Sequence, residues 1–385
     1  MPDFLVTIHA LGHTIEPCVN ELSYYFSDRF IQDIDAKLAD STYDLIFTFN
    51  YFPAVSNSAE RYHIPYVSWV YDCPHYTLYS TSIRNSYNYI FLFDRNMWAA
   101  AVQNTAGHAF HLPLAVNTER IKNFLHLSSD EASFHPAAYE DDISFVGSLY
   151  ENSCNDSLKH APLHLRGYLN GIIAAQKQLW GTDVISEVLT PSIIEEMRPL
   201  LPYAPAADEF YTEKEVFSNT IQKRITSEER VEALTRLARR HNVSLYSDSD
   251  RSLCPNVLSK GGVSYTYKMP DVFYHSKINL NITLRSITSG IPLRALDILG
   301  CGGFLLSNYQ PELCEYFTPD VDFVYFEDMD DLEQKADYYL SHEKERKEIA
   351  YQGYLTAREH FSYQSQVSKM LAIVQSELST SNRNN

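Results

Sequence analysis

The chain has 385 residues, a length that predicts two domains of ordinary size rather than a single core. Hydrophobic residues make up 45% of the chain and aromatic residues 13%, which excludes a largely disordered protein. The formal net charge of −18 at pH 7 argues against nucleic acid or an anionic membrane as the main partner.

The six cysteines are scattered along the chain without a CxxC pair, so the sequence predicts neither a disulfide framework nor a zinc site. The first residues lack the basic start and the apolar run of a signal peptide. No window reaches the roughly 18 apolar residues that span a bilayer. We therefore expect reduced thiols, no transmembrane segment and a cytoplasmic location.

Short apolar runs in the first third of the chain predict buried strands at residues 4–8, 44–49, 66–70 and 89–93. Polar stretches with room for helices separate these runs. This pattern is typical of a parallel α/β sheet. Residues 111–117 are then expected to leave this first domain.

A second α/β unit is predicted to open with a strand at residues 143–146. The section from about residue 150 to 240 is polar and predicts helices without a convincing strand. Strands are expected again at residues 243–246, 277–282, 304–306 and 321–326. Charged helices should follow, and the last residues should be disordered.

Two such units in sequence predict two facing Rossmann-like domains with a cleft between them, where ligands bind beyond the carboxyl ends of the strands. The expected domains are residues 1–116 on the acceptor side and 117–360 on the nucleotide-sugar side, the latter with the helical insertion. A C-terminal helix and disordered tail are expected over residues 361–385.

The segment from residue 289 to 307 predicts a loop, a short helix, a glycine stop and a buried strand. Pro292 suits the first helical position, because its ring presets φ and its missing N–H would be unpaired there. Gly302 and Gly303 are expected to end the helix before the next strand.

Arg294 would lie in the first turn of this helix. A helix N-terminus with free N–H groups, a positive dipole end and an arginine is suited to bind phosphate. Asp297 follows three residues later on the same face, where its carboxylate can accept hydrogen bonds from sugar hydroxyls. Together these residues indicate a nucleotide-sugar site.

Three further positions are candidates on the donor side. Gly147 and Ser148 follow a predicted strand, and their backbone N–H groups could line a diphosphate pocket. Arg285 lies in a loop after another strand, where it is either a phosphate ligand or a surface charge. Asp248 and Asp250 form a DxD pattern, but their neighbours predict a turn, so no metal site is predicted.

Candidates on the acceptor side lie in the first unit. Asp72 follows an apolar strand and precedes a proline turn, so it is either a turn cap or a carboxylate that contacts the acceptor hydroxyl or removes its proton. His75 is a second candidate for that task. Gly12 and His13 follow the first predicted strand, where a loop could approach donor or acceptor.

Several segments resemble a known family. INLNITLRSITSGIPLRALDILGCGGFLLS (278–307) resembles the C-terminal signature of the CgeB-like (spore maturation type) glycosyltransferases. VSWVYDCPHYTLYS (67–80) and YNYIFLFDR (87–95) look like the N-terminal domain that accompanies it. YFEDMDDLEQKADYYLSHEKERKEIAYQGY (325–354) is similar to the usual ending of the family.

The resemblance implies a GT-B fold, with the donor nucleotide in the C-terminal domain and the acceptor toward the N-terminal one. Asp297 then stands where related enzymes place the second glutamate of an E-x7-E motif, the ribose contact. Ser289 takes the place of the first glutamate, so its hydroxyl or the backbone N–H groups of Gly290 and Ile291 would replace the sugar contact. The diphosphate charge would rest on Arg294 and Arg285.

The predicted function is therefore a glycosyltransferase that moves a sugar from a nucleoside diphosphate sugar to a hydroxyl of a glycan, a protein or a cell-surface polymer. Arg294 would stabilise the leaving diphosphate, the task that a metal performs elsewhere, and Asp72 would face the acceptor. An inverting route would use Asp72 as the base, whereas a retaining route could use the donor's own phosphate oxygen. No cofactor, no metal and no nucleic-acid partner are expected. A nucleotide-sugar epimerase of the same fold and a non-catalytic nucleotide-sugar-binding protein remain as alternatives.

Overall fold

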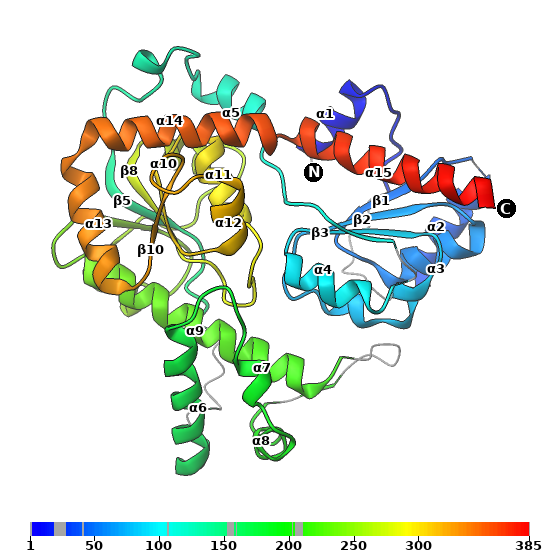
Figure 1. Ribbon diagram of the computed structural model, residues 1–385, viewed down its shortest axis with the longest axis horizontal. Coiled ribbons are helices and arrows are strands. Elements are labelled where there is room, and N and C mark those ends of the chain that lie inside the picture. The colour runs from blue at the N-terminus through cyan, green and yellow to red at the C-terminus, as the bar shows by residue number, and fades with distance from the viewer. Residues whose placement is uncertain are drawn as a thin grey trace. The chain divides into compact units, whose positions relative to one another are not determined.

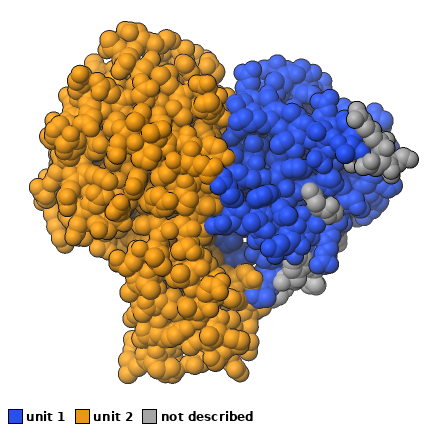
Figure 2. All heavy atoms as spheres, viewed as in Figure 1, with its two compact units in different colours: residues 1–114, 204–212, 363–385 blue, residues 115–203, 213–362 orange. Residues whose placement is uncertain are grey.

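A computed structural model describes residues 2–18, 28–40, 42–105, 108–151, 158, 160–201, 203–204 and 211–384. The chain divides into two units, each of which is coloured separately in Figure 2. Unit 1 comprises residues 1–114, 204–212 and 363–385, and unit 2 comprises residues 115–203 and 213–362. The C-terminal helix that the sequence set apart as its own segment therefore belongs with the N-terminal residues.

Unit 1 is a parallel sheet with helices. Its strands are β1 (Ile46–Phe49), β2 (Tyr66–Val70), β3 (Asn88–Leu92) and β4 (Ala109–His111). Its helices are α1 (Pro2–Ala10), α2 (Asp28–Asp40), α3 (Pro53–Tyr62), α4 (Arg95–Val102) and α15 (Tyr363–Asn384). The strands lie in the order β1-β2-β3-β4, and every neighbouring pair is parallel. The strands predicted at residues 44–49, 66–70 and 89–93 are confirmed.

The first predicted strand, at residues 4–8, is wrong, because these residues form helix α1. Phe4 and Ile8 are buried while Val6 is 66% exposed. A strand would point all three side chains to one face, whereas a helix places only residues four apart together. The Phe4 ring stacks on the Phe47 ring of β1, with centroids 3.9 Å apart. Contact with the sheet thus favours the helical spacing.

The C-terminal residues expected to be disordered continue helix α15 as far as Asn384. Val367, Met370 and Val374 are buried at helical spacing along α15. The side-chain amide of Gln366 donates to the Pro113 carbonyl at 3.0 Å. These contacts hold the first half of α15 against the rest of unit 1, and the polar residues that follow continue its helical backbone.

Unit 2 contains a longer parallel sheet and the helical insertion. Its strands are β5 (Asp141–Val146), β6 (Val243–Tyr246), β7 (Leu258–Ser259), β8 (Ser276–Asn281), β9 (Leu305–Asn308) and β10 (Val324–Phe326), in the order β10-β9-β8-β5-β6-β7. Its helices are α5 (Thr118–Leu125), α6 (Leu163–Lys177), α7 (Ile185–Val188), α8 (Pro191–Met197), α9 (Glu213–Leu237), α10 (Lys268–Tyr274), α11 (Leu293–Gly300), α12 (Pro311–Tyr316), α13 (Met329–Ser341) and α14 (Glu343–His360).

Helices cover both faces of this sheet (Figure 1). Along β8 and its end, Ile278, Leu280 and Ile282 belong to the core that α9 and α13 complete on one face. Asn279 points to the other face, where its amide donates to the Phe273 carbonyl of α10 at 3.0 Å. The period-two alternation of β8 therefore serves two helical layers, the arrangement of a doubly wound Rossmann-like domain.

The predicted helical insertion has a core of its own. Leu165 and Leu169 of α6 pack in one cluster with Ile185 of α7 and with Phe217 and Ile221 of α9. Further along α9, the apolar side chains join the sheet core instead. The long helix α9 thus links the insertion to the Rossmann-like part of unit 2. Within the described residues, no helix is both long enough and apolar enough to cross a membrane.

Candidate functional site

The candidate donor site lies at the carboxyl ends of two neighbouring strands of unit 2. Strand β5 pairs with β8, and Gly147 and Ser148 follow the end of β5. The loop after β8 runs from residue 282 to 292 and leads into α11. Ligands of parallel α/β sheets bind beyond this edge. The topology therefore brings the predicted residues after β5 and those before α11 to one edge.

Arg230 of α9 reaches this edge from the helical layer and is almost fully buried. Its Nη1 donates to the Ser148 carbonyl at 2.6 Å, and its Nε and Nη2 donate to the Ile282 carbonyl at 3.1 and 2.5 Å. The guanidinium also lies over the rings of Phe145 and Tyr150. Among the described residues, no carboxylate forms an ion pair with Arg230.

Arg294 is close enough to Arg230 for their charges to interact. Burial is the main cause that lowers the pKa of Arg230 to about 10. The positive charge of Arg294 acts in the same direction, while Tyr150 and the charge of Glu229 oppose the shift. The Arg294 side chain is 31% exposed, and its Nη1 lies 3.5 Å from Oδ2 of Asp297. Two cations that approach each other without a neutralising carboxylate on the buried one form a favourable site for an anion.

Arg230 was missed by the sequence prediction, although the sequence contains a signal for it. Ala233, Leu234 and Leu237 follow Arg230 at i+3, i+4 and i+7, so all four residues share one helical face. That face packs into the sheet core. An arginine on the apolar face of an amphipathic helix is the signal in the sequence that indicates a buried charge.

Helix α11 forms close to its predicted position. It begins at Leu293, so Pro292 immediately precedes the helix and is not its first residue as predicted. Gly302 has a φ of +70°, and a Cβ at this position would lie 2.5 Å from the Phe134 ring. Glycine is therefore required there both by the left-handed backbone and by the close approach.

Asp297, the predicted ribose contact, is buried in the second turn of α11. Its Oδ1 accepts a hydrogen bond of 2.9 Å from the hydroxyl of Tyr265. The Tyr265 side chain is itself among the exposed large hydrophobic groups of the chain. The role of Asp297 toward a ribose stays a prediction, and Tyr265 and Arg294 are among the groups that lie at its carboxylate in this structure.

Ser289 and Gly290 lie in a loop that the segment before α12 holds in place. The Ser289 hydroxyl donates to Oε1 of the buried Glu312 at 2.7 Å. The side-chain amide of Gln310 donates to the Gly290 carbonyl at 3.0 Å. A carboxylate is thus present beside Ser289, but it comes from the start of α12. The predicted contacts of Ser289 and Gly290 with the donor sugar stay predictions.

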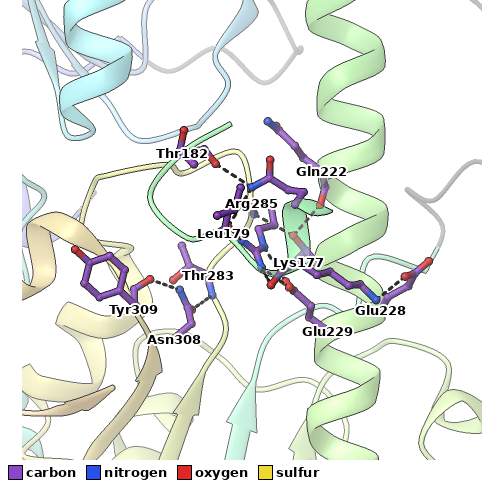
Figure 3. A network of polar contacts seen from close by, with 12 residues as sticks. Lys177, Leu179, Thr182, Gln222, Glu228, Glu229, Thr283, Arg285, Asn308 and Tyr309 are labelled. Carbon is purple, nitrogen blue, oxygen red and sulfur yellow. Dashed lines mark hydrogen bonds and ion pairs between the residues drawn. The ribbon is translucent and has the colours of Figure 1, made fainter. Parts of the chain in front are cut away.

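Arg285 is buried in a network of polar contacts, so the surface-charge alternative is wrong (Figure 3). Its guanidinium forms an ion pair with the buried Glu229 and donates to the Leu179 carbonyl at 2.6 Å. It also lies 3.4 Å from the centre of the Trp180 ring. Because the guanidinium is engaged by these groups, the geometry does not favour Arg285 as a phosphate ligand. It joins the loop after β8 to the insertion.

A small hollow lies beside this network. It is lined by Trp180, Gly181, Thr182, Thr283, Leu284, Arg285, Ile287, Thr288 and Gln310. Its volume of about 10 Å³ is room for about one water molecule. The hollow is therefore far too small to hold a sugar ring.

Replacement of Glu229 by alanine is expected to destabilise unit 2 by about 3–5 kcal/mol, because the charge of Arg285 then stays buried without a partner. Burial raises the pKa of Glu229, and the hydrogen bonds from Arg285 oppose this shift. Urea unfolding of the full chain measures the loss. Glu228→Ala is the matched control, since the neighbouring Glu228 makes partly exposed pairs with Lys177 and Arg224, each worth about 1 kcal/mol or less. Equal losses in both variants would contradict this account.

Asp72 of unit 1 is exposed at the carboxyl end of β2. Asn50 follows the neighbouring strand β1, and its Nδ2 donates to Oδ2 of Asp72 at 2.8 Å. The role of Asp72 toward an acceptor stays a prediction. The sequence prediction did not include Asn50, because the contact arises only where β1 and β2 pair.

The other acceptor-side candidates have less support from their surroundings. His75 is buried, and its Nε2 lies 3.0 Å from the Tyr51 N–H and 2.6 Å from the Thr77 hydroxyl. Burial lowers the pKa of His75, which favours the neutral ring. Gly12 and His13 were predicted to follow a strand, but they follow helix α1, so that basis for their role is wrong.

The DxD pattern forms turns, as predicted. Asp248 accepts the Gly262 N–H at 3.0 Å through its Oδ1. Asp250 accepts the Ser252 N–H at 2.9 Å and the Ser252 hydroxyl at 2.8 Å. Asp250 therefore stabilises the turn that follows it, whereas Asp248 holds the backbone of a segment fourteen residues further along the chain.

Comparisons with known proteins relate this chain to glycosyltransferases. A family described as glycosyl transferase-like matches residues 223–372, which include Arg230, Arg285, Arg294 and Asp297. No curated protein matches the chain. A glycosyltransferase from Rickettsia africae ESF-5 is similar in structure, with a TM-score of 0.54, 13% identity, and coverage of 98% of this chain and 93% of that chain. HepE of Anabaena in complex with UDP-glucose has a TM-score of 0.50 and 10% identity over 90% of this chain and 82% of its own.

These findings confirm the predicted GT-B fold and the predicted enzyme class, a glycosyltransferase. The structural similarities, at 13% and 10% identity, bear on the fold, while the enzyme class rests on the family match. The finer assignment to the CgeB-like enzymes stays a prediction.

Proposed function

We propose that unit 2 binds a nucleoside diphosphate sugar, with the diphosphate at Arg230 and Arg294 and the ribose at Asp297. The observation that supports this most is the buried guanidinium of Arg230, which has no carboxylate partner among the described residues and lies near a second arginine. Its hydrogen bonds go to carbonyls at the ends of β5 and β8, the edge where ligands of such sheets bind.

The proposed reaction transfers the sugar to a hydroxyl group. The bond between the anomeric carbon and the diphosphate oxygen breaks, and its electron pair stays on the diphosphate. Arg230 and Arg294 stabilise this growing negative charge, which is worth more in a buried site than in water. The acceptor oxygen forms the new bond to the anomeric carbon, and its proton passes to the carboxylate of Asp72.

The finer identities are also proposals. We propose a glycan or protein acceptor and a relationship to the CgeB-like enzymes, which rests on the segments quoted above. A cytoplasmic location is supported by the reduced thiols of Cys18, Cys254, Cys301 and Cys314. Cys154 lies outside the described residues.

A panel of nucleoside diphosphates and their sugars, measured by thermal shift, tests the proposed function. UDP-glucose is the first probe, because HepE of Anabaena was solved with it. We expect at least one member of the panel to raise the melting temperature through binding to the folded state. If no nucleotide stabilised the protein, the proposed donor site would be refuted.

Replacement of Arg294 by alanine should weaken the binding of the stabilising nucleotide about tenfold. The loss of one charge-assisted hydrogen bond of roughly 1.5 kcal/mol accounts for this factor. Isothermal titration calorimetry measures the dissociation constant. Arg239→Ala removes an exposed arginine of the same unit and serves as the control, for which unchanged binding is expected. Equal affinity in Arg294→Ala and the wild type would contradict the assignment.

A further inference from the structure

Asn50 has an unusual backbone conformation at the carboxyl end of β1. Its φ is +62°, in the left-handed region that few residues other than glycine adopt, and asparagine is among those that tolerate it. Its N–H donates to the Trp69 carbonyl of β2 at 2.8 Å, so the pairing of the two strands extends to this residue. The conformation directs the chain away from the sheet while the side chain stays next to the end of β2.

The side chain of Asn50 forms hydrogen bonds with the residues that follow β2. Its Oδ1 accepts the Tyr71 N–H at 2.8 Å and the Asp72 N–H at 3.2 Å. Its Nδ2 donates to Oδ2 of Asp72 at 2.8 Å. One amide group thus holds both the backbone and the carboxylate of Asp72. A glycine would suit the backbone conformation equally well, but it would provide none of these hydrogen bonds.

One carboxylate oxygen of Asp72, Oδ2, accepts the hydrogen bond from Asn50, and the other, Oδ1, is available to a further donor. Asp72 is exposed, and among the described residues no donor hydrogen-bonds its Oδ1. The nearby titratable groups on its own segment include Tyr71, Cys73 and His75, and the Tyr71 hydroxyl lies 3.3 Å from that of Tyr363 on α15. Burial raises the pKa of the Cys73 thiol well above its usual value and lowers that of His75, so both favour the neutral form. The buried Asp94, which follows β3, acts on the same segment and caps α4 by accepting the Met97 N–H.

We propose that Asn50 is a positioning residue that orients Asp72 to accept the proton of the acceptor hydroxyl. This inference rests on the proposed function, in which Asp72 is the base. In the transfer step the O–H bond of the acceptor breaks and its proton moves to Oδ1 of Asp72. The acceptor oxygen bonds to the anomeric carbon as the diphosphate leaves with the electron pair of the broken bond. The amide of Asn50 stays neutral and donates to Oδ2 throughout.

The substitution Asn50→Asp distinguishes a positioning role from a merely structural one, because only the positioning role predicts a change in the pH–rate profile. Asn50→Asp keeps both acceptor bonds to the backbone N–H groups but replaces the N–H donor by a second carboxylate oxygen. Because a neighbouring like charge disfavours ionisation, we expect the acidic limb of the pH–rate profile to move to higher pH by about one unit. Sugar transfer or hydrolysis is measured with UDP-glucose first and then with the other donors of the panel.

Two further variants complete this test. Asn50→Gly suits the left-handed backbone, removes the side-chain bonds, and is expected to lower kcat about tenfold with an unchanged dissociation constant for the donor. Asn57→Asp is the matched control, because it adds the same charge at an exposed position of unit 1 whose Oδ1 accepts a hydrogen bond from Asn85. Its pH–rate profile should match that of the wild type.

The outcomes separate the inference from the proposed function. If Asn50→Asp and Asn50→Gly behave like the wild type while Asp72→Asn loses transfer, the role of Asn50 is overturned and the proposed function stands. If Asp72→Asn transfers sugar at the wild-type rate, the assignment of the base fails, and the role of Asn50 fails with it. A higher-pH acidic limb in Asn50→Asp alone, together with the loss in Asn50→Gly, supports the inference.

Discussion

Replacement of Arg230 by methionine is expected to abolish nucleotide binding, with a dissociation constant raised at least about a hundredfold. A buried guanidinium that meets a diphosphate forms charge-assisted bonds at low dielectric, and a hundredfold loss corresponds to about 2.7 kcal/mol. Methionine fills a similar volume and lacks the charge. Calorimetric titration with the nucleotide that stabilises the wild type measures this loss.

The same substitution leaves the carbonyls of Ser148 and Ile282 without their donor, so some loss of stability is expected as well. Arg230→Lys therefore serves as a second variant, because it keeps the charge and should retain part of the affinity. Arg239→Met, at an exposed position further along the same segment, controls for the removal of an arginine. A folded Arg230→Met protein that binds nucleotide as tightly as the wild type would refute the proposed diphosphate site.

Replacement of Asp72 by asparagine should reduce sugar transfer by a factor of about 10² to 10⁴, the usual contribution of a positioned general base. The two side chains have the same shape, so the fold of unit 1 should be kept. The donor contacts proposed above all lie in unit 2, so the dissociation constant of the donor should not change. Steady-state kinetics and calorimetry on the same preparation measure the two effects.

Asp44→Asn is a suitable control for this experiment, because Asp44 is an exposed aspartate of unit 1 that lies before β1, at the opposite end of the strand from Asn50. Its kcat should equal that of the wild type. An epimerase needs no acceptor base, so a donor-only incubation that yields an epimer in Asp72→Asn would favour that alternative. Transfer at the wild-type rate in Asp72→Asn would remove Asp72 from the mechanism.

Most strands of both sheets were predictable because continuous apolar runs bounded by polar segments have few other uses in a chain of this composition. The short strands β4 and β7 were not predicted. Residues 4–8 were predicted as a strand but form a helix. A run of five mostly apolar residues satisfies both the strand and the helix pattern, and contact with Phe47 on the neighbouring strand decides between them. Short apolar runs carry this ambiguity wherever no glycine or proline bounds them.

The candidate site was predicted in part. Arg294 and Asp297 could be found because the dipole, the first turn and the three-residue spacing of α11 are local properties of the sequence. Arg285 was located in the correct loop, but its partner Glu229 lies 56 residues away, and no local pattern connects them. Asn50 and Asp72 meet only through the register of β1 and β2.

The sequence by itself therefore determined the α/β class, most strands, the helix with Arg294 and the resemblance that led to the enzyme class. These features depend on periodicity and on residues close together in the chain. The tertiary structure alone decided which buried charges have a neutralising partner. Arg285 is neutralised by a buried carboxylate, whereas Arg230 is buried beside carbonyls and a second arginine. Burial and pairing set the free energy of a charge, and both arise from contacts between residues distant in sequence.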